Sequence, residues 1–275
     1  MTICVPDTLT SDNSEKYEVS IRLWPGGLSF SGYIPMDKDS FFTETLSFDA
    51  DIPVVQSLKD IFFDNPCFSY VYKSLYIVCA SGKYTLVPDS VFLEKGKELL
   101  FSFCHKTDSA EKILAQPLRG LNSSLLFGTN SEAYEFLMRS LVNPQFIHSL
   151  SPMLNLWRES SMACHPKQIY IFVHDDMFDI VCFERGEMLF INSFDYETGK
   201  DMVYYIMYVC KQLGIEQLDD CLHFCGDKIK CQSVMAVVKK YIRQIDYLSP
   251  EMGHYQVAIG KNVFIDTVAL AECGL

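Results

Sequence analysis

One order of elements occurs twice in this sequence, and that repetition constrains the fold more than any other feature. Each half of the 275 residues reads as three strands joined by tight turns, followed by alternating helices and strands. Apolar and polar residues alternate over residues 17–23, which predicts a strand with one buried and one solvent-exposed face. Residues 169–173 are apolar throughout, as expected of a strand buried on both faces. The repetition predicts an internal duplication of one α/β fold.

The first half opens with a hairpin. Its turn contains Trp24, Pro25, Gly26 and Gly27. Pro25 presets φ at the first turn position, and Gly26 is expected to supply the positive φ that a type II turn requires next. The other elements expected here are a strand at 42–48, a helix opened by Pro53, a strand at 75–79, a helix after Asp89 up to Phe103, two strands within 113–127, a helix from Thr129 and a helix at 153–157.

The second half repeats this order. A turn at 174–176 leads to a strand at 177–183, and a second turn at 184–187 leads to a strand at 188–194. A helix after Thr198, a strand at 221–225, a helix after Gly226 and a strand near Ile245 follow, and the residues beyond are left unassigned. The polar stretch 158–167 separates the halves, so we expect two domains at residues 15–157 and 168–275.

Two predicted helices carry capping signals. Thr129 and Glu132 have the spacing of a capping box before an apolar helical face. Thr198 can cap the helix that follows it, and Gly214 stands where a C′ glycine is expected. These signals predict where both helices begin and where one of them ends.

Composition narrows the class of protein. With 49% hydrophobic and 21% charged residues the chain is globular, and its longest apolar runs are far short of the ~20 residues that span a bilayer. No secretory signal is visible at the N-terminus, so a cytoplasmic protein is expected. The eleven cysteines are odd in number and several lie in apolar runs, which favours buried, reduced thiols. A net charge of −12 disfavours a nucleic-acid partner.

The repeated order resembles the actin-like ATPase fold, which pairs two ribonuclease-H-like domains in actin, sugar kinases and heat-shock chaperones. More narrowly, the run IYIFVHDDMFDIVCFERGEMLFINSFD within residues 168–195 is similar to a family of uncharacterised bacterial proteins, a domain of unknown function, that is assigned this fold. The resemblance implies an α/β fold with a mixed sheet in each half, a three-strand meander plus parallel strands, flanked by helices. It implies no established activity.

The resemblance also implies where a nucleotide would bind. In functioning members, an Asp at the end of the first strand and a glycine-rich hairpin hold metal and phosphate, once in each half. Glycine lets backbone N–H groups close on phosphate, and the carboxylate positions Mg²⁺. The first half offers Gly26 and Gly27 for the nucleotide, but it has Arg22 and Trp24 where the Asp would be sought.

The second half offers the complementary part of this apparatus. Asp175 and Asp176 are the candidate metal ligands, but their turn has no glycine. Gly226 stands where the superfamily places an adenosine-contacting glycine after the fourth strand. ATP and Mg²⁺ are therefore possible ligands by resemblance, with an incomplete phosphate loop in each half.

Two further clusters have more than one interpretation. Cys221 and Cys225 would lie ~13 Å apart on a strand, too far for one Zn²⁺ with bonds near ~2.3 Å, whereas a loop would permit a metal site. The group around His174 and Asp179 is a solvated turn, a remnant metal site, or the carboxylate cluster of a nuclease that also draws on Glu184 or Asp195.

Two functions of different class are consistent with the sequence. The preferred one is a degenerate, non-hydrolysing member that acts as an intracellular interaction module for an unidentified protein partner. The alternative is a nucleotide-dependent ATPase or kinase with atypical phosphate loops. Whether the chain is an enzyme is left open, and no catalytic residue is assigned.

Overall fold

The computed structural model describes residues 2–250, 257–259 and 263–273. The chain forms two compact units, one comprising Met1–Pro152 with Gly253–Leu275 and the other Met153–Met252. The C-terminal segment therefore belongs to the first unit, although the division expected from the sequence placed it in the second half.

The first unit holds most of the secondary structure. Its strands are β1 (Glu18–Trp24), β2 (Gly27–Tyr33), β3 (Phe41–Ser47), β4 (Ser74–Cys79), β5 (Tyr84–Pro88), β6 (Glu111–Leu118), β7 (Ser123–Asn130), β8 (Gln145–His148) and β14 (Val257–Ile259). Its helices are α1 (Val54–Asp64), α2 (Lys97–Cys104), α3 (Ser131–Ser140) and α7 (Ile265–Cys273), with 3-10 turns at Ser14–Lys16, Pro66–Ser69 and Glu94–Gly96.

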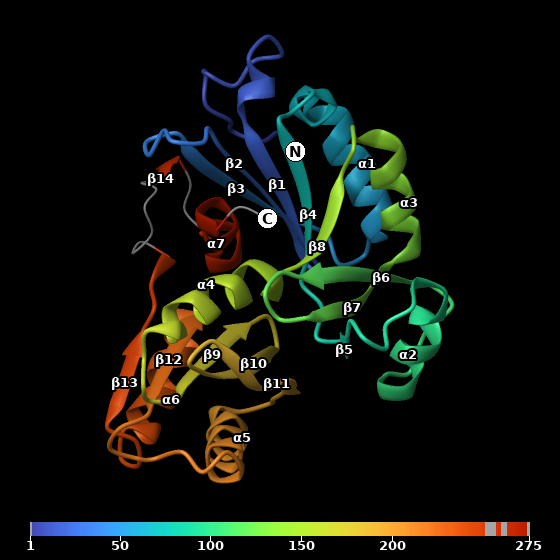
Figure 1. Cartoon of the computed structure of the whole chain (residues 1–275). Coiled ribbons are helices and arrows are strands. Elements are labelled where there is room, and N and C mark those ends of the chain that lie inside the picture. The colour runs from blue at the N-terminus through green and yellow to red at the C-terminus, as the bar shows by residue number, and fades with distance from the viewer. Residues whose placement is uncertain (1, 251–256, 260–262, 274–275) are drawn as a thin grey trace. The chain divides into compact units, whose positions relative to one another are not determined.

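A six-stranded mixed sheet forms the centre of this unit, in the order β14-β3-β2-β1-β4-β8. The first three strands are an antiparallel meander, and β4 and β8 continue it in parallel with β1. In Figure 1, α1 and α3 lie on one side of the sheet and α7 on the other. Buried contacts of Val268 and Ala271 with Tyr33 and Phe41 hold α7 on the sheet.

The two faces of this sheet differ because side chains alternate along each strand. Val19 and Ile21 are buried on the face away from α7, whereas Ser20 and Arg22 are buried on the face that α7 covers. The covered face is unusually polar. On the neighbouring strands, hydroxyl groups there bond to one another, as in the 2.8 Å contact between Ser31 Oγ and Thr43 Oγ1.

A small antiparallel sheet, β5-β7-β6, is inserted between β4 and α3. Helix α2 packs on it through Phe101, which joins Val87, Ile113 and Leu126 in a separate apolar cluster. The predicted helix after Asp89 is therefore shorter than expected, since the chain forms the 3-10 turn Glu94–Gly96 before α2 begins. Strands β5 and β8 were not expected from the sequence.

Helix α4 (Leu150–Met162) runs across the boundary between the units. The second unit then contains β9 (Gln168–His174), β10 (Met177–Glu184), β11 (Glu187–Asp195), α5 (Gly199–Gln212), β12 (Cys221–Gly226), α6 (Lys228–Val238) and β13 (Gln244–Tyr247). Its sheet order is β11-β10-β9-β12-β13, with β9 to β11 antiparallel and β9, β12 and β13 parallel. This is the strand order of the first unit without β14, which confirms the expected fold class.

The core of the second unit lies between its sheet and the helices α5 and α6. Ile171, Phe178 and Phe224 of the strands pack there against Ile206 and Val234 of the helices. On the opposite face, Trp157 of α4 stacks on Tyr170, with ring centroids 4.7 Å apart. The unit thus has helices on both faces of its sheet.

The capping predictions had mixed outcomes. Thr198 and Asp201 form the capping box of α5, and Gly214 has the left-handed φ of 59° expected at C′. The N-cap of α3, by contrast, is Asn130, whose side chain accepts a hydrogen bond from the Ala133 N–H. The prediction that Thr129 caps this helix was wrong because β7 continues through Thr129 and the helix begins later.

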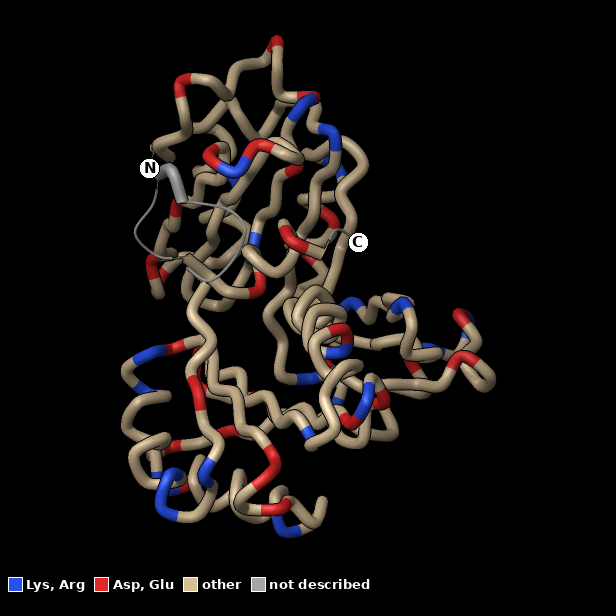
Figure 2. The backbone as a smooth tube through the Cα atoms, turned by 60° about the vertical axis from the view of Figure 1, so that its left-hand side comes forward, with Lys and Arg blue, Asp and Glu red and all other residues tan. Residues whose placement is uncertain are grey.

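Charged residues are spread over both units and the two signs are interspersed along the chain (Figure 2). Within the described residues, no helix has the length and apolarity needed to cross a membrane.

Candidate functional site

In the first unit, the carboxyl ends of the parallel strands β1 and β4 open onto a cavity of about 420 Å³. Ligands of open α/β sheets bind at this edge, where the loops leave the strands. The cavity is lined by the turn after β1, the exit of β4, the small inserted sheet and the start of α3. The nucleotide site expected in the first half would therefore lie in this cavity.

Glycines form part of the turn after β1, but an aromatic ring lies over them. Trp24 pairs with Gly27 across the hairpin, so Pro25 and Gly26 make a two-residue link. A Cβ on Gly27 would lie 2.3 Å from the Leu46 carbonyl oxygen and 2.7 Å from the Trp24 ring. Glycine is needed here for close packing of strand and indole.

The expected type II turn was wrong, because Gly26 does not adopt a positive φ. A Cβ on Gly26 would lie 3.3 Å from the indole nitrogen of Trp24. The small size of this residue therefore matters more than its freedom to adopt left-handed backbone.

Arg22 is completely buried near the carboxyl end of β1. Its Nε donates a hydrogen bond to Oδ2 of Asp266 on α7, at 2.7 Å. Its guanidinium carbon lies 4.2 Å from the ring centroid of Phe264 and 5.6 Å from that of Trp24. Among the described residues, neither Arg22 Nη1 nor Asp266 Oδ1 has a hydrogen-bond partner. The guanidinium is therefore neutralised inside the fold.

The polar side chains of the cavity carry more negative than positive charge. Among the described residues that line it, the one cation is Lys83, which lies 3.0 Å from Oε1 of Glu111, and Asp108 is a second carboxylate. At the start of α3, the Ser131 N–H already bonds to the Ala110 carbonyl. Among the described residues, the lining offers no unpaired cation, and the first N–H of α3 is already bonded, so the cavity fits a triphosphate poorly.

The cavity also contains a cysteine at the end of β4. Burial raises the pKa of the Cys79 thiol to about 12, although a hydrogen bond with Thr129 acts in the opposite direction. The thiol therefore stays protonated at neutral pH. Since the thiolate is the nucleophile, Cys79 is chemically inert in this setting.

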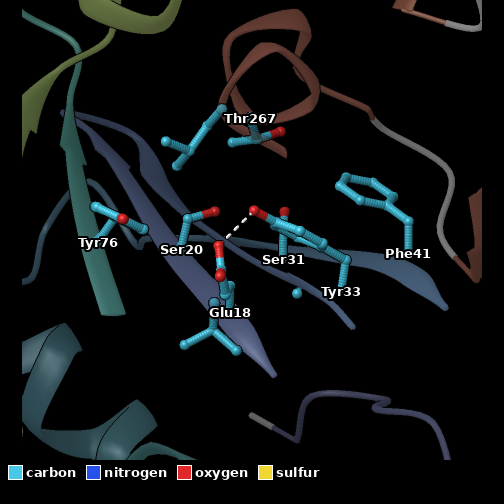
Figure 3. Close-up of a pocket in the computed structure, with 10 residues that line it drawn as sticks. Glu18, Ser20, Ser31, Tyr33, Phe41, Tyr76 and Thr267 are labelled. Carbon is cyan, nitrogen blue, oxygen red and sulfur yellow. Dashed lines mark hydrogen bonds between the residues drawn. The ribbon is translucent and has the colours of Figure 1, made fainter. Parts of the chain in front are cut away.

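A second, much smaller cavity of about 10 Å³ lies beneath α7 (Figure 3). Glu18 and Tyr33 point toward one another at its edge, and the Tyr33 hydroxyl donates to Glu18 at 2.6 Å. Thr267 of α7 faces them from above. A space of this size holds about one water molecule. It is therefore too small for a substrate.

In the second unit, Asp175 and Asp176 form the turn between β9 and β10. Asp175 has a left-handed φ of 49°, and its Oδ2 lies 3.3 Å from Nδ1 of His174. Lys230 Nζ donates to the Asp175 carbonyl at 2.8 Å and lies 3.9 Å from Oδ1 of the fully exposed Asp176. Both carboxylates thus have basic groups beside them.

Gly226 ends β12 next to the same turn. Its φ is 95°, and a Cβ there would lie 1.9 Å from the Val173 carbonyl oxygen. The Asp227 N–H bonds to that oxygen at 2.8 Å. The Asp227 side chain in turn caps α6 by accepting from the Ile229 and Lys230 N–H groups, both at 3.0 Å. A carboxylate of the chain itself therefore occupies this helix N-terminus.

Comparison with known proteins places the chain in a family. Residues 6–245 match a family described as "Protein of unknown function (DUF3822)". The chain belongs to this family. No curated protein matches it.

Solved structures agree with the fold of the family. A Bacteroides thetaiotaomicron VPI-5482 protein, described as having an actin-like ATPase fold and unknown function, is 30% identical, with a TM-score of 0.83 over 96% of this chain and 99% of that one. The PilM–PilN type IV pilus biogenesis complex matches at 10% identity, with a TM-score of 0.57 over 93% of this chain and 97% of that one. The latter likeness shows the fold alone.

The structure thus brings together some of the residues singled out in the sequence. Three of them lie at one edge of the sheet in the second unit. Lys230 contacts both Asp175 and Asp176, and Gly226 packs against the Val173 carbonyl. Gly26 and Gly27 lie in the first unit, beneath Trp24. Their roles in nucleotide or metal binding stay predictions for this family.

The positions of the strands decide between the interpretations of the two other sequence clusters. Cys221 and Cys225 lie on β12, as the strand interpretation required. His174 Nε2 lies 2.7 Å from Oδ2 of the buried Asp179, so the interpretation of this pair as part of a solvated turn was wrong. Glu184 stands at the far end of β10 from the Asp175 turn, which removes it from any carboxylate cluster there.

The most important residue that the sequence did not reveal is Asp266. It lies in the C-terminal stretch that had no assignment, and it pairs with a residue 244 positions away. The one available signal was an acidic residue shortly before the apolar run at residues 268–271.

Proposed function

We propose that this protein is a non-hydrolysing member of the actin-like fold that acts as a protein-interaction module. The observation that carries this proposal is the buried Arg22–Asp266 pair at the carboxyl end of β1. It stands where a functioning member would place a metal-positioning carboxylate. A guanidinium there opposes Mg²⁺, and its own charge is already compensated by Asp266.

The surroundings of this pair support the same conclusion. Trp24 covers Gly26 and Gly27, so the turn does not present an open backbone cradle to phosphate. In the described lining of the adjoining cavity, two carboxylates accompany one lysine, which is itself paired. A triphosphate at this place would meet like charge without a free cation to offset it.

The interaction role has a separate basis. The PilM–PilN type IV pilus biogenesis complex is similar to this chain in fold, at a TM-score of 0.57. A protein of this fold can therefore be part of a protein complex. The partner proposed for the present chain is likewise a protein.

Thermal unfolding with and without millimolar Mg²⁺-ATP tests the proposal. A ligand that binds only the folded state at ~100 times its Kd adds about 2.7 kcal/mol to the free energy of unfolding, which raises the melting temperature by several degrees. We expect no such rise and no phosphate release. A rise accompanied by turnover would contradict the proposal.

The alternative is a nucleotide-dependent ATPase or kinase, and one observation favours it. Asp175, Asp176 and Gly226 do converge at one edge of the second unit. Under this alternative, ATP and Mg²⁺ are bound, and changing Asp175→Asn together with Asp176→Asn abolishes a Mg²⁺-dependent thermal shift. The exposed Asp219→Asn serves as a matched control that leaves the shift intact.

A further inference from the structure

Strand β11 is an outer strand of the sheet in the second unit. Its inner side pairs with β10 along its whole length, from Asp195 opposite Met177 to Glu187 opposite Glu184. Within the described part of the chain, no residue bonds to the backbone groups that point outward from β11. An unpaired row of N–H and C=O groups is a template for another strand.

The other outer strands of the described sheets are short, or contain proline or internal charge, and β11 has none of these three features. Strands β8, β13 and β14 have only 4, 4 and 3 residues, β5 ends in Pro88, and β6 contains Lys112 and Pro117. β11 has 9 residues and no proline, and its charges stand only at its two ends. Short strands, internal charge and proline are the usual means of blocking edge pairing.

The strand is held firmly enough to act as a template. Phe190 and Phe194 pack into the core against the helices, while Leu189 and Asn192 remain exposed. A β-bulge lies near the first end, where the register with β10 shifts between Cys182 and Phe183. From Phe190 to Phe194 the strand is regular and uncharged.

The two acidic ends determine which strand can pair with this edge. A second copy of β11, paired antiparallel about Ile191, would place Glu187 opposite Asp195 at both ends. Like charges directly opposite one another destabilise a pair of strands. The acids therefore oppose self-association, whereas a strand with Lys or Arg at both ends would gain two favourable cross-strand pairs.

We propose that β11 binds an extended segment of a partner protein by strand addition, and that this segment is about nine residues long, apolar or neutral in its middle and basic at both ends. A segment of that length spans ~30 Å. The proposal rests on the interaction role proposed above and names its recognition chemistry. Backbone hydrogen bonds supply affinity, and the end charges supply specificity.

The test uses the full chain and two synthetic peptides with the same alternating Thr and Val centre. One peptide has Lys at both ends and the other has Glu, with blocked termini and a fluorescent label for anisotropy. We expect the Lys-flanked peptide to bind about tenfold more tightly, with a preference that weakens as salt is added. N-methylation of alternate backbone amides should abolish its binding, because strand pairing needs those N–H groups.

Charge reversal on the strand provides the matched comparison. With Glu187→Lys and Asp195→Lys together, we expect the preference to invert in favour of the Glu-flanked peptide. The control is Glu216→Lys with Asp219→Lys, which makes the same change of charge at exposed positions outside the strand and keeps the original preference. Unchanged melting temperatures show that both variants are folded.

The proposal is overturned if the Lys-flanked peptide does not bind at millimolar concentration, if both peptides bind equally, or if the strand variant keeps the original preference. These outcomes are independent of the nucleotide experiment. A thermal shift with Mg²⁺-ATP would overturn the non-hydrolysing function without affecting peptide binding, and loss of peptide binding would leave the nucleotide result standing.

Discussion

At the scale of single residues, the buried Arg22–Asp266 pair is the most consequential feature of the first unit. Removing two charges from water is costly, and only a short, well-directed contact offsets that cost. The 2.7 Å bond does so for Nε, and the two neighbouring rings contact the guanidinium face. Burial makes each partner depend on the other, so loss of one leaves the other charge uncompensated.

Asp266→Ala should therefore lower the free energy of unfolding by about 3–5 kcal/mol, because Arg22 would stay buried without its carboxylate. The double variant Arg22→Met with Asp266→Leu should recover most of that loss, since an apolar pair of similar volume has no charge to desolvate. Urea unfolding of the three proteins measures both effects. A double variant no more stable than Asp266→Ala would show that the ion pair is not the cause.

At the scale of elements, the connection between β12 and α6 depends on one close approach. Gly226 lets the chain cross against the Val173 carbonyl, and the next residue bonds to that carbonyl and caps α6. A strand end, a hairpin turn and a helix start are thus joined through a few backbone atoms. The arrangement explains the glycine by packing, independently of any ligand.

Gly226→Ala should lower the free energy of unfolding by at least about 2 kcal/mol, because its φ of 95° and the 1.9 Å approach exclude a Cβ. Gly96→Ala is the matched control. A Cβ at Gly96 would meet nothing within 4 Å, so its effect should stay within about 1 kcal/mol, the cost of an alanine at the N-cap of α2. Equal unfolding midpoints for the two variants would contradict this account.

At the scale of the whole molecule, the C-terminus completes the first unit. Six consecutive residues of α7 are buried, and they cover a sheet in which four of the six strands come from the first eighty residues. The polar character of that face makes α7 a cover held by Asp266 and a few apolar contacts. The first unit therefore depends on residues that follow the whole second unit in the sequence.

Removing residues 253–275 should destabilise the first unit selectively. Arg22 would lose the carboxylate of Asp266, and Tyr33 and Phe41 would lose their contacts with α7. Hydrogen exchange read by mass spectrometry should show loss of protection in β1 and β2, with protection in β9 and β10 retained. Unchanged protection in β1 would mean that α7 contributes little to the stability of its unit.

Much of the fold could be predicted because it is local. Alternation over residues 17–23, the apolar run at 169–173 and the cap at Thr198 each specify an element from neighbouring residues alone. Predictions were wrong where a contact with another element determined the structure. Thr129 does not cap α3, because β7 pairs with β5 and β6 and extends past Thr129.

The sequence by itself determined the repeated order of elements, and with it the fold class, because periodicity and turn residues act over a few positions. Only the tertiary structure decided which side chains lie at the carboxyl ends of the strands, where ligands of such sheets bind. The pairing of Arg22 with Asp266 joins residues 244 positions apart, and the Trp24 ring over Gly27 depends on how a strand packs. Neither contact can be predicted from a local sequence pattern, because both depend on which surfaces pack together in the folded protein.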